Sequence, residues 1–370
     1  MRVKTSEMSI KEILVKQYYL YPKMQIQDMI KLIHQNEFAG GHLIESEEDS
    51  LQRLQEEWRC LEQLSPDRKI YNDVFESIGN NLCRLHLAAL KHCNSIKHYS
   101  ISLSTINRFF ISTANSIQGS VESFEKKLDE LRQCCKEGQL PYSLEELDAC
   151  LSSYKKKGYP PISHSEIYRA AYFPAYRVVG SEYRDFFELF CKIDSLMREK
   201  DRVNVAIDGN CGAGKTTLAS LIANIYECNI FHMDDFFLTP ELKTEERLKE
   251  VGGNVDYVRF KHEVIDGLNS GREFQYRKYD CKSMTFQQPI SVTPKKLNII
   301  EGSYSMHPTL INNYDLKIFL NINEKEQISR ILKRNGAFML KRFIHEWIPM
   351  ENRYFKGFNI KEQSDLVFEM

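Results

Sequence analysis

Hydrophobic residues recur with a helical period through the first half of the chain. In MQIQDMIKLIHQNEF, apolar side chains return every three to four residues, at Met24, Ile26, Met29, Ile30 and Ile33. The same period predicts helices in DVFESIGNNLCRLHLAALKHC, SLSTINRFFISTANSI, VESFEKKLDELRQCC and SLEELDACLSSYKKKG. Proline and glycine interrupt the pattern between several of these segments. We therefore expect residues 1–178 to form an all-α domain.

A different pattern begins near residue 180. One more amphipathic helix is expected in SEYRDFFELFCKIDSLMREK, and after it short apolar runs alternate with helical segments. The runs typical of strands are 203–207, 228–233, 297–300, 316–322 and 365–368. Strands that alternate with helices indicate a mostly parallel sheet with helices on both faces. Residues 179–370 are therefore expected to form an α/β domain.

The first expected strand leads into a glycine-rich loop that fits G-x-x-x-x-G-K-[ST] and precedes an expected helix. This is the context in which the motif binds polyphosphate, because glycines let phosphate oxygens approach backbone N–H groups. Lys215 is expected to reach the β- and γ-phosphates of ATP, and the Thr216 hydroxyl to bind Mg²⁺. A chance glycine-rich turn is the alternative. The expected ATP-binding residues are Gly209, Asn210, Cys211, Gly212, Ala213, Gly214, Lys215, Thr216 and Thr217.

Carboxylates follow the next two expected strands. Asp234 and Asp235 stand at the end of the second strand and Glu301 at the end of the third. Ligands of open parallel sheets bind at the carboxyl ends of the strands. Asp234 is predicted to take the proton of an attacking hydroxyl or to hold a Mg²⁺-bound water, and Glu301 to steady Mg²⁺. The alternatives are a turn-capping Asp and an exposed strand-end Glu.

A basic run, SRILKRNG, follows the fourth expected strand. Arg330 and Arg334 are one helical turn apart within it. Phosphoryl transfer needs cations over the transferring group, so both arginines are predicted to act on the phosphates. A solvated basic helix face is the alternative interpretation.

The net charge and the cysteine pattern limit the kinds of partner and the cellular compartment that we expect. The formal net charge of −1 shows no basic excess that would favour nucleic acid or an anionic membrane. The N-terminal segment lacks the apolar core of a signal peptide, and no run is long enough for a membrane span. The ten cysteines include no C-x-x-C pair and no zinc-site spacing. We therefore expect a cytoplasmic protein with reduced thiols and no nucleic-acid or membrane partner.

Residues 200–370 resemble the uridine kinase branch of the P-loop kinases. The resemblance is carried, in order, by GNCGAGKTT, MDDFFLTPE, GGNVDYVRF, YRKYDC, IIEGSYSMHP, YDLKIFLNI and RILKRNG. The DDFF and PE residues are especially similar to those of nicotinamide riboside kinases. The resemblance implies an ATP- and Mg²⁺-dependent kinase acting on a hydroxyl. It implies that Asp234 is the catalytic or metal-linked acid and that Thr216 and Glu301 surround Mg²⁺, with Arg330 and Arg334 in a lid helix.

The acceptor is less well indicated. Asp235, Tyr279 and His307 are candidates to contact a small-molecule phosphoacceptor because they lie in the motifs quoted above. Uridine kinases usually carry a histidine-bearing segment after their YD, and it contacts the pyrimidine base. The corresponding segment here, KYDCKSMTFQQPI, contains no histidine. Uridine and cytidine are therefore expected to be poor substrates.

The helical half has no counterpart in minimal nucleoside kinases. Its segment 159–177 is rich in tyrosine, histidine and arginine, which makes Tyr168 and Arg169 further candidates for acceptor binding. Packing of aromatic residues is the alternative, with Ser163 and Glu166 as a capping box. His42 follows two glycines after an expected helix, where a glycine C-cap explains the pattern without a ligand.

Three functions are compatible with these motifs. A small-molecule kinase explains both the phosphate loop and the acidic strand ends. An ATP-binding regulatory or interaction module, in which the helical domain senses nucleotide state, explains only the loop. A kinase that acts on a macromolecule is disfavoured for RNA ends by the near-neutral charge.

Overall fold

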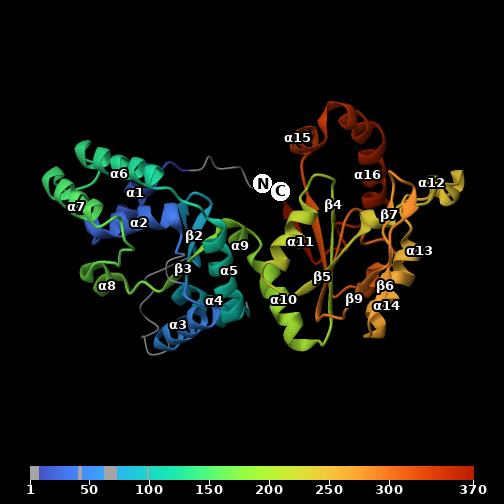
Figure 1. Cartoon of the computed structure of the whole chain (residues 1–370), viewed down its shortest axis with the longest axis horizontal. Coiled ribbons are helices and arrows are strands. Elements are labelled where there is room, and N and C mark those ends of the chain that lie inside the picture. The colour runs from blue at the N-terminus through green and yellow to red at the C-terminus, as the bar shows by residue number, and fades with distance from the viewer. Residues whose placement is uncertain (1–7, 41–43, 62–72, 98–99) are drawn as a thin grey trace. The chain divides into compact units, whose positions relative to one another are not determined.

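The computed structural model describes residues 8–40, 44–61, 73–97 and 100–370, which form two compact units (Figure 1). The chain divides between Cys191 and Lys192, inside helix α10 (Phe187–Glu199). The predicted boundary at residue 178 was wrong, because it falls inside strand β3 (Tyr176–Gly180), which pairs with strand β2 of the N-terminal unit.

The N-terminal unit is mainly helical, as expected. Serine side chains cap the first turns of most of its helices, with Ser9, Ser46, Ser102, Ser120, Ser143 and Ser165 each accepting a hydrogen bond from a backbone N–H group. Its helices before β3 are α1 (Ile10–Leu20), α2 (Ile26–Phe38), α3 (Glu47–Cys60), α4 (Leu87–Lys97), α5 (Leu103–Ser116), α6 (Val121–Lys136), α7 (Leu144–Lys156) and α8 (Glu166–Tyr172).

The expectation of an all-α domain needs one correction. The segment DVFESIGNNLCRLHLAALKHC contains the hairpin β1 (Phe75–Gly79) and β2 (Leu82–His86) before α4 begins. Asn80 and Asn81 both have φ of 54°, the left-handed backbone that a two-residue hairpin turn needs and that asparagine tolerates. The helical spacing of apolar residues there concealed this turn.

Strand β3 completes an antiparallel sheet with the order β1-β2-β3, in which β2 is central and fully buried. Apolar residues of α1, α2, α6 and α7 form a core that also reaches Ile78, Leu82 and Val178 of the sheet. The short helix α9 (Ser181–Asp185) then leads to α10. The sheet thus joins segments that lie about a hundred positions apart in the sequence.

The C-terminal unit is built on five parallel strands: β4 (Val203–Gly209), β5 (Cys228–His232), β10 (Leu297–Glu301), β11 (Leu316–Asn321) and β12 (Leu366–Glu369). All five were expected from the sequence. Their order across the sheet is β12-β11-β4-β10-β5. Strand β10 therefore separates β4 from β5, and its last residue, Glu301, pairs with Ile207 on one side and His232 on the other.

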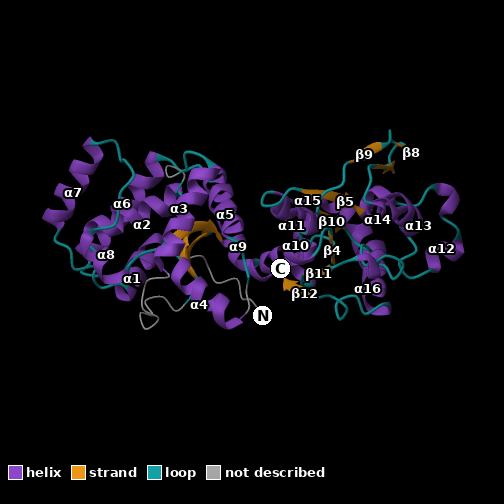
Figure 2. Ribbon diagram, turned by 90° about the horizontal axis from the view of Figure 1, so that it is seen from below, coloured by secondary structure: helices purple, strands orange, loops and turns teal. Residues whose placement is uncertain are grey.

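Helices cover both faces of this sheet. Helix α11 (Lys215–Ala223) packs on β4 and β10, and Figures 1 and 2 show α10 and α11 on one side and α13, α14 and α16 on the other. The remaining helical elements are η3 (Met233–Phe236), η4 (Pro240–Leu242), α12 (Glu245–Lys249), α13 (Tyr257–Phe260), η5 (Lys261–Ile265), α14 (Asp266–Ser270), η6 (Ile311–Asn313), α15 (Glu324–Arg342), η7 (Phe343–Trp347) and α16 (Ile348–Gly357).

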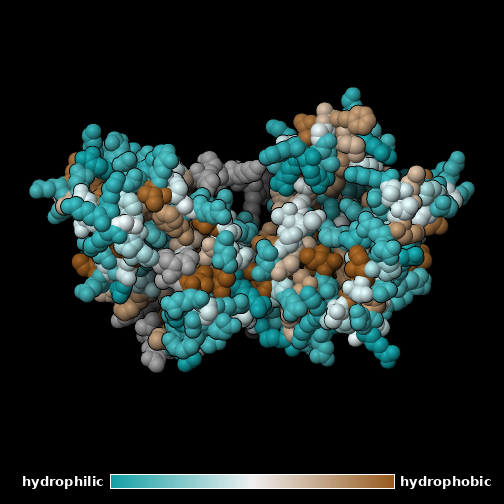
Figure 3. All heavy atoms as spheres, in the orientation of Figure 1, coloured by the Kyte–Doolittle hydropathy of each residue, from teal (hydrophilic) through white to brown (hydrophobic). Residues whose placement is uncertain are grey.

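Two short antiparallel pairs complete the unit: β6 (Phe274–Tyr276) with β9 (Ile290–Val292), and between them the hairpin of β7 (Tyr279–Asp280) with β8 (Thr285–Phe286). The visible face of each unit is mostly hydrophilic, with scattered apolar patches (Figure 3). None of the helices in the described ranges is long and apolar enough to span a membrane.

Candidate phosphate-binding and catalytic site

All three glycines of the loop between β4 and α11 have positive φ, and the need for glycine is clear at Gly209 and Gly214. Gly209 has φ of 137°, and a Cβ atom there would lie 2.2 Å from the carbonyl oxygen of Leu320. Gly214, the N-cap of α11, has φ of 99°. Left-handed backbone is costly for residues with a Cβ atom, and it turns successive N–H groups toward one concavity. The loop therefore has the backbone form of an anion-binding site at a helix N-terminus.

Lys215 lies across this loop. Its Nζ donates hydrogen bonds to the carbonyl oxygens of Gly209 and Asn210, at 2.7 and 3.1 Å, and to the Ser303 hydroxyl at 3.2 Å. All three acceptors are uncharged, so the ammonium charge is not neutralised by these contacts. The side chain is held where a polyphosphate on the loop would meet a positive charge.

The other expected phosphate-loop residues form or flank the same loop. The Asn210 side chain accepts a bond from the Ile322 N–H at 3.2 Å, and Ala213 is buried. Cys211 is also buried, and burial raises the pKa of its thiol to about 12. This cysteine therefore stays a neutral packing residue. Thr217, in the first turn of α11, is exposed.

Thr216 and Glu301 are brought together at the end of the sheet. The Thr216 hydroxyl donates to Glu301 Oε1 at 3.0 Å, and the same oxygen accepts from His232 Nδ1 at 2.5 Å. This hydrogen bond raises the pKa of His232, and burial opposes the shift. A hydroxyl and a carboxylate are oxygen donors of the kind that Mg²⁺ takes together with water and phosphate. The pair therefore fits the expected Mg²⁺ site, although no cluster of three or more His, Cys, Asp or Glu metal ligands occurs among the described residues.

The two aspartates after β5 differ in their surroundings. Asp235 forms an ion pair with Lys278 at 2.9 Å. The Asp234 side chain is exposed to solvent and forms no ion pair with any described residue. The surrounding protein nevertheless displaces enough water to raise the pKa of Asp234, and the carboxylates of Glu301 and Glu351 raise it further against the lowering effect of Lys215. Asp234 is thus the carboxylate that an incoming molecule can reach.

The predicted lid arginines lie in different positions on α15. Arg330 donates from Nη1 to the carbonyl oxygen of Gly212 at 3.4 Å and pairs with Glu326 at 3.1 Å, so it borders the loop. Arg334 is exposed, and its Nε donates to the neighbouring Asn335 side chain at 2.7 Å. The helix is kinked at Gly336, where φ is 76°. The structure thus brings Arg330, but not Arg334, to the phosphate loop.

Tyr279 and His307 are packing residues in the structure. Tyr279 is buried against Phe286 of the β7–β8 hairpin. His307 stacks on Tyr257 with ring centroids 3.9 Å apart, and burial lowers its pKa to about 4. Their role toward an acceptor stays a prediction.

Tyr168 and Arg169 lie in the N-terminal unit. Tyr168 is buried and stacks on His164 at 4.3 Å, whereas Arg169 is exposed and borders a cavity. The predicted capping box was wrong, because Ser165 rather than Ser163 caps α8, with its hydroxyl 3.1 Å from the Tyr168 N–H. His42 lies outside the described residues.

Glu351, which was not expected from the sequence, supports the phosphate loop from α16. Its buried carboxylate accepts from the Cys211 N–H at 3.0 Å and from the Ser303 hydroxyl at 2.5 Å, and Ser303 in turn contacts Lys215. No local signal points to Glu351, which is 140 positions from Cys211 in the sequence.

Asp208 was also missed, although it directly precedes the motif. It is fully buried and accepts bonds from the N–H groups of Gly209 and Met306 and from the Tyr354 hydroxyl. Burial raises its pKa to about 6. The residue ties the end of β4 to the loop that follows β10 and to α16, so it positions the glycine-rich loop.

No family model and no curated protein matches this chain. Solved structures that it resembles include one described as a possible uridine kinase from Bacillus stearothermophilus, with 20% identity over 49% of this chain and 99% of that chain and a TM-score of 0.38. A deoxyadenosine kinase from M. mycoides with bound dATP is 19% identical over 46% and 90% of the two chains, with a TM-score of 0.24.

These similarities are too distant to assign an activity. The fold is evident from the molecule itself. Counted along the sequence, the strands lie in the order 2-3-1-4-5 across an all-parallel sheet, and the glycine-rich loop joins the first strand to a helix. Helices cover both faces. The C-terminal unit is an α/β domain with the P-loop kinase fold, and it follows a mainly helical unit.

Proposed function

We propose that this protein is an ATP-dependent kinase that transfers the γ-phosphoryl group to a hydroxyl of a small metabolite. The main support for the proposal is that three groups lie at the carboxyl ends of the adjacent strands β4, β10 and β5. They are Lys215 on its loop, Thr216 bonded to Glu301, and the accessible Asp234 at the end of the neighbouring strand segment. Phosphoryl transfer needs little beyond such positioning and charge stabilisation.

The loop and Lys215 would bind the phosphates of ATP. The backbone N–H groups at the start of α11 and the Lys215 ammonium supply positive charge to the β- and γ-phosphates. Thr216 and Glu301 would hold Mg²⁺, which neutralises phosphate charge when it is bound. Arg330 lies beside Gly212 and can turn toward the transferring group. Each of these residues would therefore stabilise the negative charge of the phosphates, and none would act as a nucleophile.

Asp234 would be the base on the acceptor side. Its carboxylate takes the hydroxyl proton as the hydroxyl oxygen forms its bond to the γ-phosphorus and the bond to the ADP oxygen breaks. A raised pKa makes the Asp234 carboxylate a stronger base toward the hydroxyl proton. Asp235 is held by Lys278, so it is less available for this step.

The acceptor is proposed to be a small hydroxylated molecule other than uridine or cytidine. The KYDCKSMTFQQPI segment forms the β7–β8 hairpin and offers no histidine to a pyrimidine base. The wild-type chain should release ADP from Mg·ATP faster when a pool of hydroxylated metabolites is added, and mass spectrometry should find a phosphorylated product. ATP turnover that is indifferent to every metabolite would favour a regulatory nucleotide-binding module instead.

A further inference from the structure

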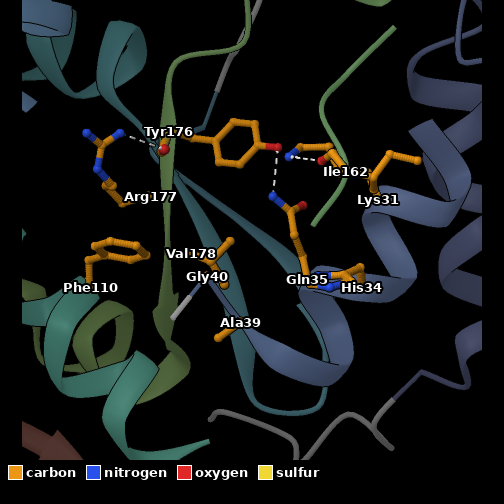
Figure 4. A pocket seen from close by; sticks show the side chains of 10 residues that line it. All are labelled: Lys31, His34, Gln35, Ala39, Gly40, Phe110, Ile162, Tyr176, Arg177 and Val178. Carbon is orange, nitrogen blue, oxygen red and sulfur yellow. Dashed lines mark hydrogen bonds between the residues drawn. The ribbon is translucent and has the colours of Figure 1, made fainter. Parts of the chain in front are cut away.

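Two cavities of the N-terminal unit share the side chain of Lys31. The smaller, of about 50 Å³, lies between α2 and β3, where Lys31, Gln35 and Tyr176 point toward one another (Figure 4). The other, more open and of about 450 Å³, is lined by Lys31, Ser163, His164, Arg169, Phe173 and Pro174. None of these residues belongs to the phosphate-loop site of the C-terminal unit.

The larger cavity carries positive charge that its surroundings do not neutralise. Lys31 Nζ donates to the uncharged carbonyl oxygen of Ile162 at 2.9 Å, and it forms no ion pair with a described residue. Arg169, exposed at the same cavity, likewise pairs with no carboxylate in the described ranges. Burial, followed by the charges of Arg84 and Arg169, lowers the pKa of Lys31 to about 8. Two cations thus converge on one space.

The nearest carboxylate is already fully engaged. Asp28 is completely buried and accepts hydrogen bonds from His164 Nδ1 at 2.8 Å and from the Ser165 hydroxyl at 2.6 Å. Burial would raise the pKa of Asp28, but these hydrogen bonds outweigh it and lower the pKa. Arg84 has its own carboxylate, Glu76, at 3.5 Å. The single charge of Asp28 is therefore left to balance both Lys31 and Arg169, and it is too little for the two.

The wall of the cavity is rigidly supported. His164 Nε2 lies 2.6 Å from the Tyr176 hydroxyl, which also accepts from Gln35 Nε2 at 2.9 Å. Burial lowers the pKa of His164 to about 4, so the ring is neutral, with its Nδ1 proton donated to Asp28. The chain of hydrogen bonds links α2, the segment before α8 and β3. It fixes the positions from which Lys31 and Arg169 reach the cavity.

We propose that Lys31 and Arg169 bind the phosphate group of a small phosphomonoester. Two converging cations suit a dianion, because an arginine fork binds two phosphate oxygens while an ammonium supplies a point charge. Phe173 and Pro174 offer an apolar surface to the organic part of such a molecule. This site is separate from the proposed kinase centre, and its occupation does not depend on that activity.

The test uses the full-length Lys215→Ala chain, so that the phosphate loop contributes little to binding. Isothermal titration with phenyl phosphate, inorganic phosphate and benzoate should give saturable binding in that order of affinity. Adding Lys31→Gln or Arg169→Gln should weaken phenyl phosphate at least about tenfold, since each removes a charge-assisted contact. Lys126→Gln, which changes an exposed lysine paired with Glu122 on α6, is the matched control and should bind normally.

Each result of these titrations either supports a phosphate site at the cavity or overturns it. The proposal would be overturned if phenyl phosphate shows no saturable binding, or if neither Lys31→Gln nor Arg169→Gln weakens its binding. Benzoate that binds as tightly as phenyl phosphate would overturn the assignment to phosphate. Arg169 is exposed, so Arg169→Gln should melt like the parent chain and remains informative even if Lys31→Gln unfolds the unit. Loss of kinase activity in the Lys215→Ala parent leaves each of these binding results unaffected.

Discussion

The two units gather charged groups in opposite ways. In the C-terminal unit, Gly209 to Thr216 are contiguous, and the turn between β4 and α11 places them together. In the N-terminal unit, Lys31 and Arg169 are distant in sequence. They meet at one cavity because His164 and Ser165, directly before α8, bond to Asp28 of α2. The first arrangement depends on local backbone geometry, the second on the packing of the whole unit.

This difference determines whether a substitution at each site affects its chemistry or the stability of the unit. A loop formed by left-handed glycines keeps its shape if one side chain is removed, so a variant there loses chemistry before it loses structure. A network of buried polar groups loses stability as well, because an unpaired partner left inside costs free energy. Activity and stability should therefore separate at the phosphate loop, whereas a variant within the buried polar network of the N-terminal unit should lose stability.

The largest expected effect is on turnover. Lys215→Ala should reduce ATP consumption to background, because no other described side chain supplies the ammonium that bridges Gly209, Asn210 and Ser303. The melting temperature should change little. Substantial turnover by this variant, measured as ADP release, would show that the phosphate loop is not the catalytic site.

The second prediction concerns the acceptor base. Asp234→Asn preserves shape and removes charge, so kcat should fall about 10²–10⁴-fold while ATP binding changes little. Asp235→Asn is the matched control, and its smaller effect should reflect only the lost ion pair with Lys278. Equal rates for wild type and Asp234→Asn would contradict the assignment. If Asp235→Asn proves the more damaging of the two, the roles of the neighbouring carboxylates are reversed.

The distinction between local geometry and distant packing also explains which features could be predicted from the sequence. Five parallel strands and the loop were expected correctly, because each buried run and the G-x-x-x-x-G-K-[ST] spacing is local. The hairpin at Asn80 and Asn81 was missed, because its apolar residues also fit a helical period. Glu351 and the bonding of His164 to Asp28 depend on distant packing, which no short pattern encodes.

The third prediction addresses the stability of the N-terminal unit. Burial would raise the pKa of Glu76, but hydrogen bonding to His86 and the charge of Arg84 outweigh it and lower the pKa to about 2. A lowered carboxylate pKa stabilises the fold above the unfolded value near 4.5, and this stabilisation disappears as the pH falls toward 2.

Glu76→Gln should therefore lower the free energy of unfolding at pH 7 by about 3 kcal/mol, and the difference from wild type should shrink between pH 4.5 and 2. Denaturant unfolding at several pH values measures this. Glu122→Gln, which breaks an exposed pair with Lys126, is the control and should change stability by less than about 1 kcal/mol. A difference that is constant with pH would exclude the charge of Glu76 as its cause.

The smallest expected effect concerns Glu351, which contacts the phosphate loop from a distant part of the sequence. Glu351→Ala leaves the Cys211 N–H and the Ser303 hydroxyl without their acceptor, so the phosphate loop should hold Lys215 less firmly. The KM for ATP should rise about tenfold, corresponding to the ~1.4 kcal/mol expected for a lost hydrogen bond to a charged group. Glu351→Gln should recover part of this, because its amide oxygen still accepts one bond.

Glu346→Gln, an exposed change nearby in η7, is the control and should leave KM for ATP unaltered. A Glu351→Ala chain with normal KM and reduced stability would place Glu351 with the structural network and not with the phosphate loop.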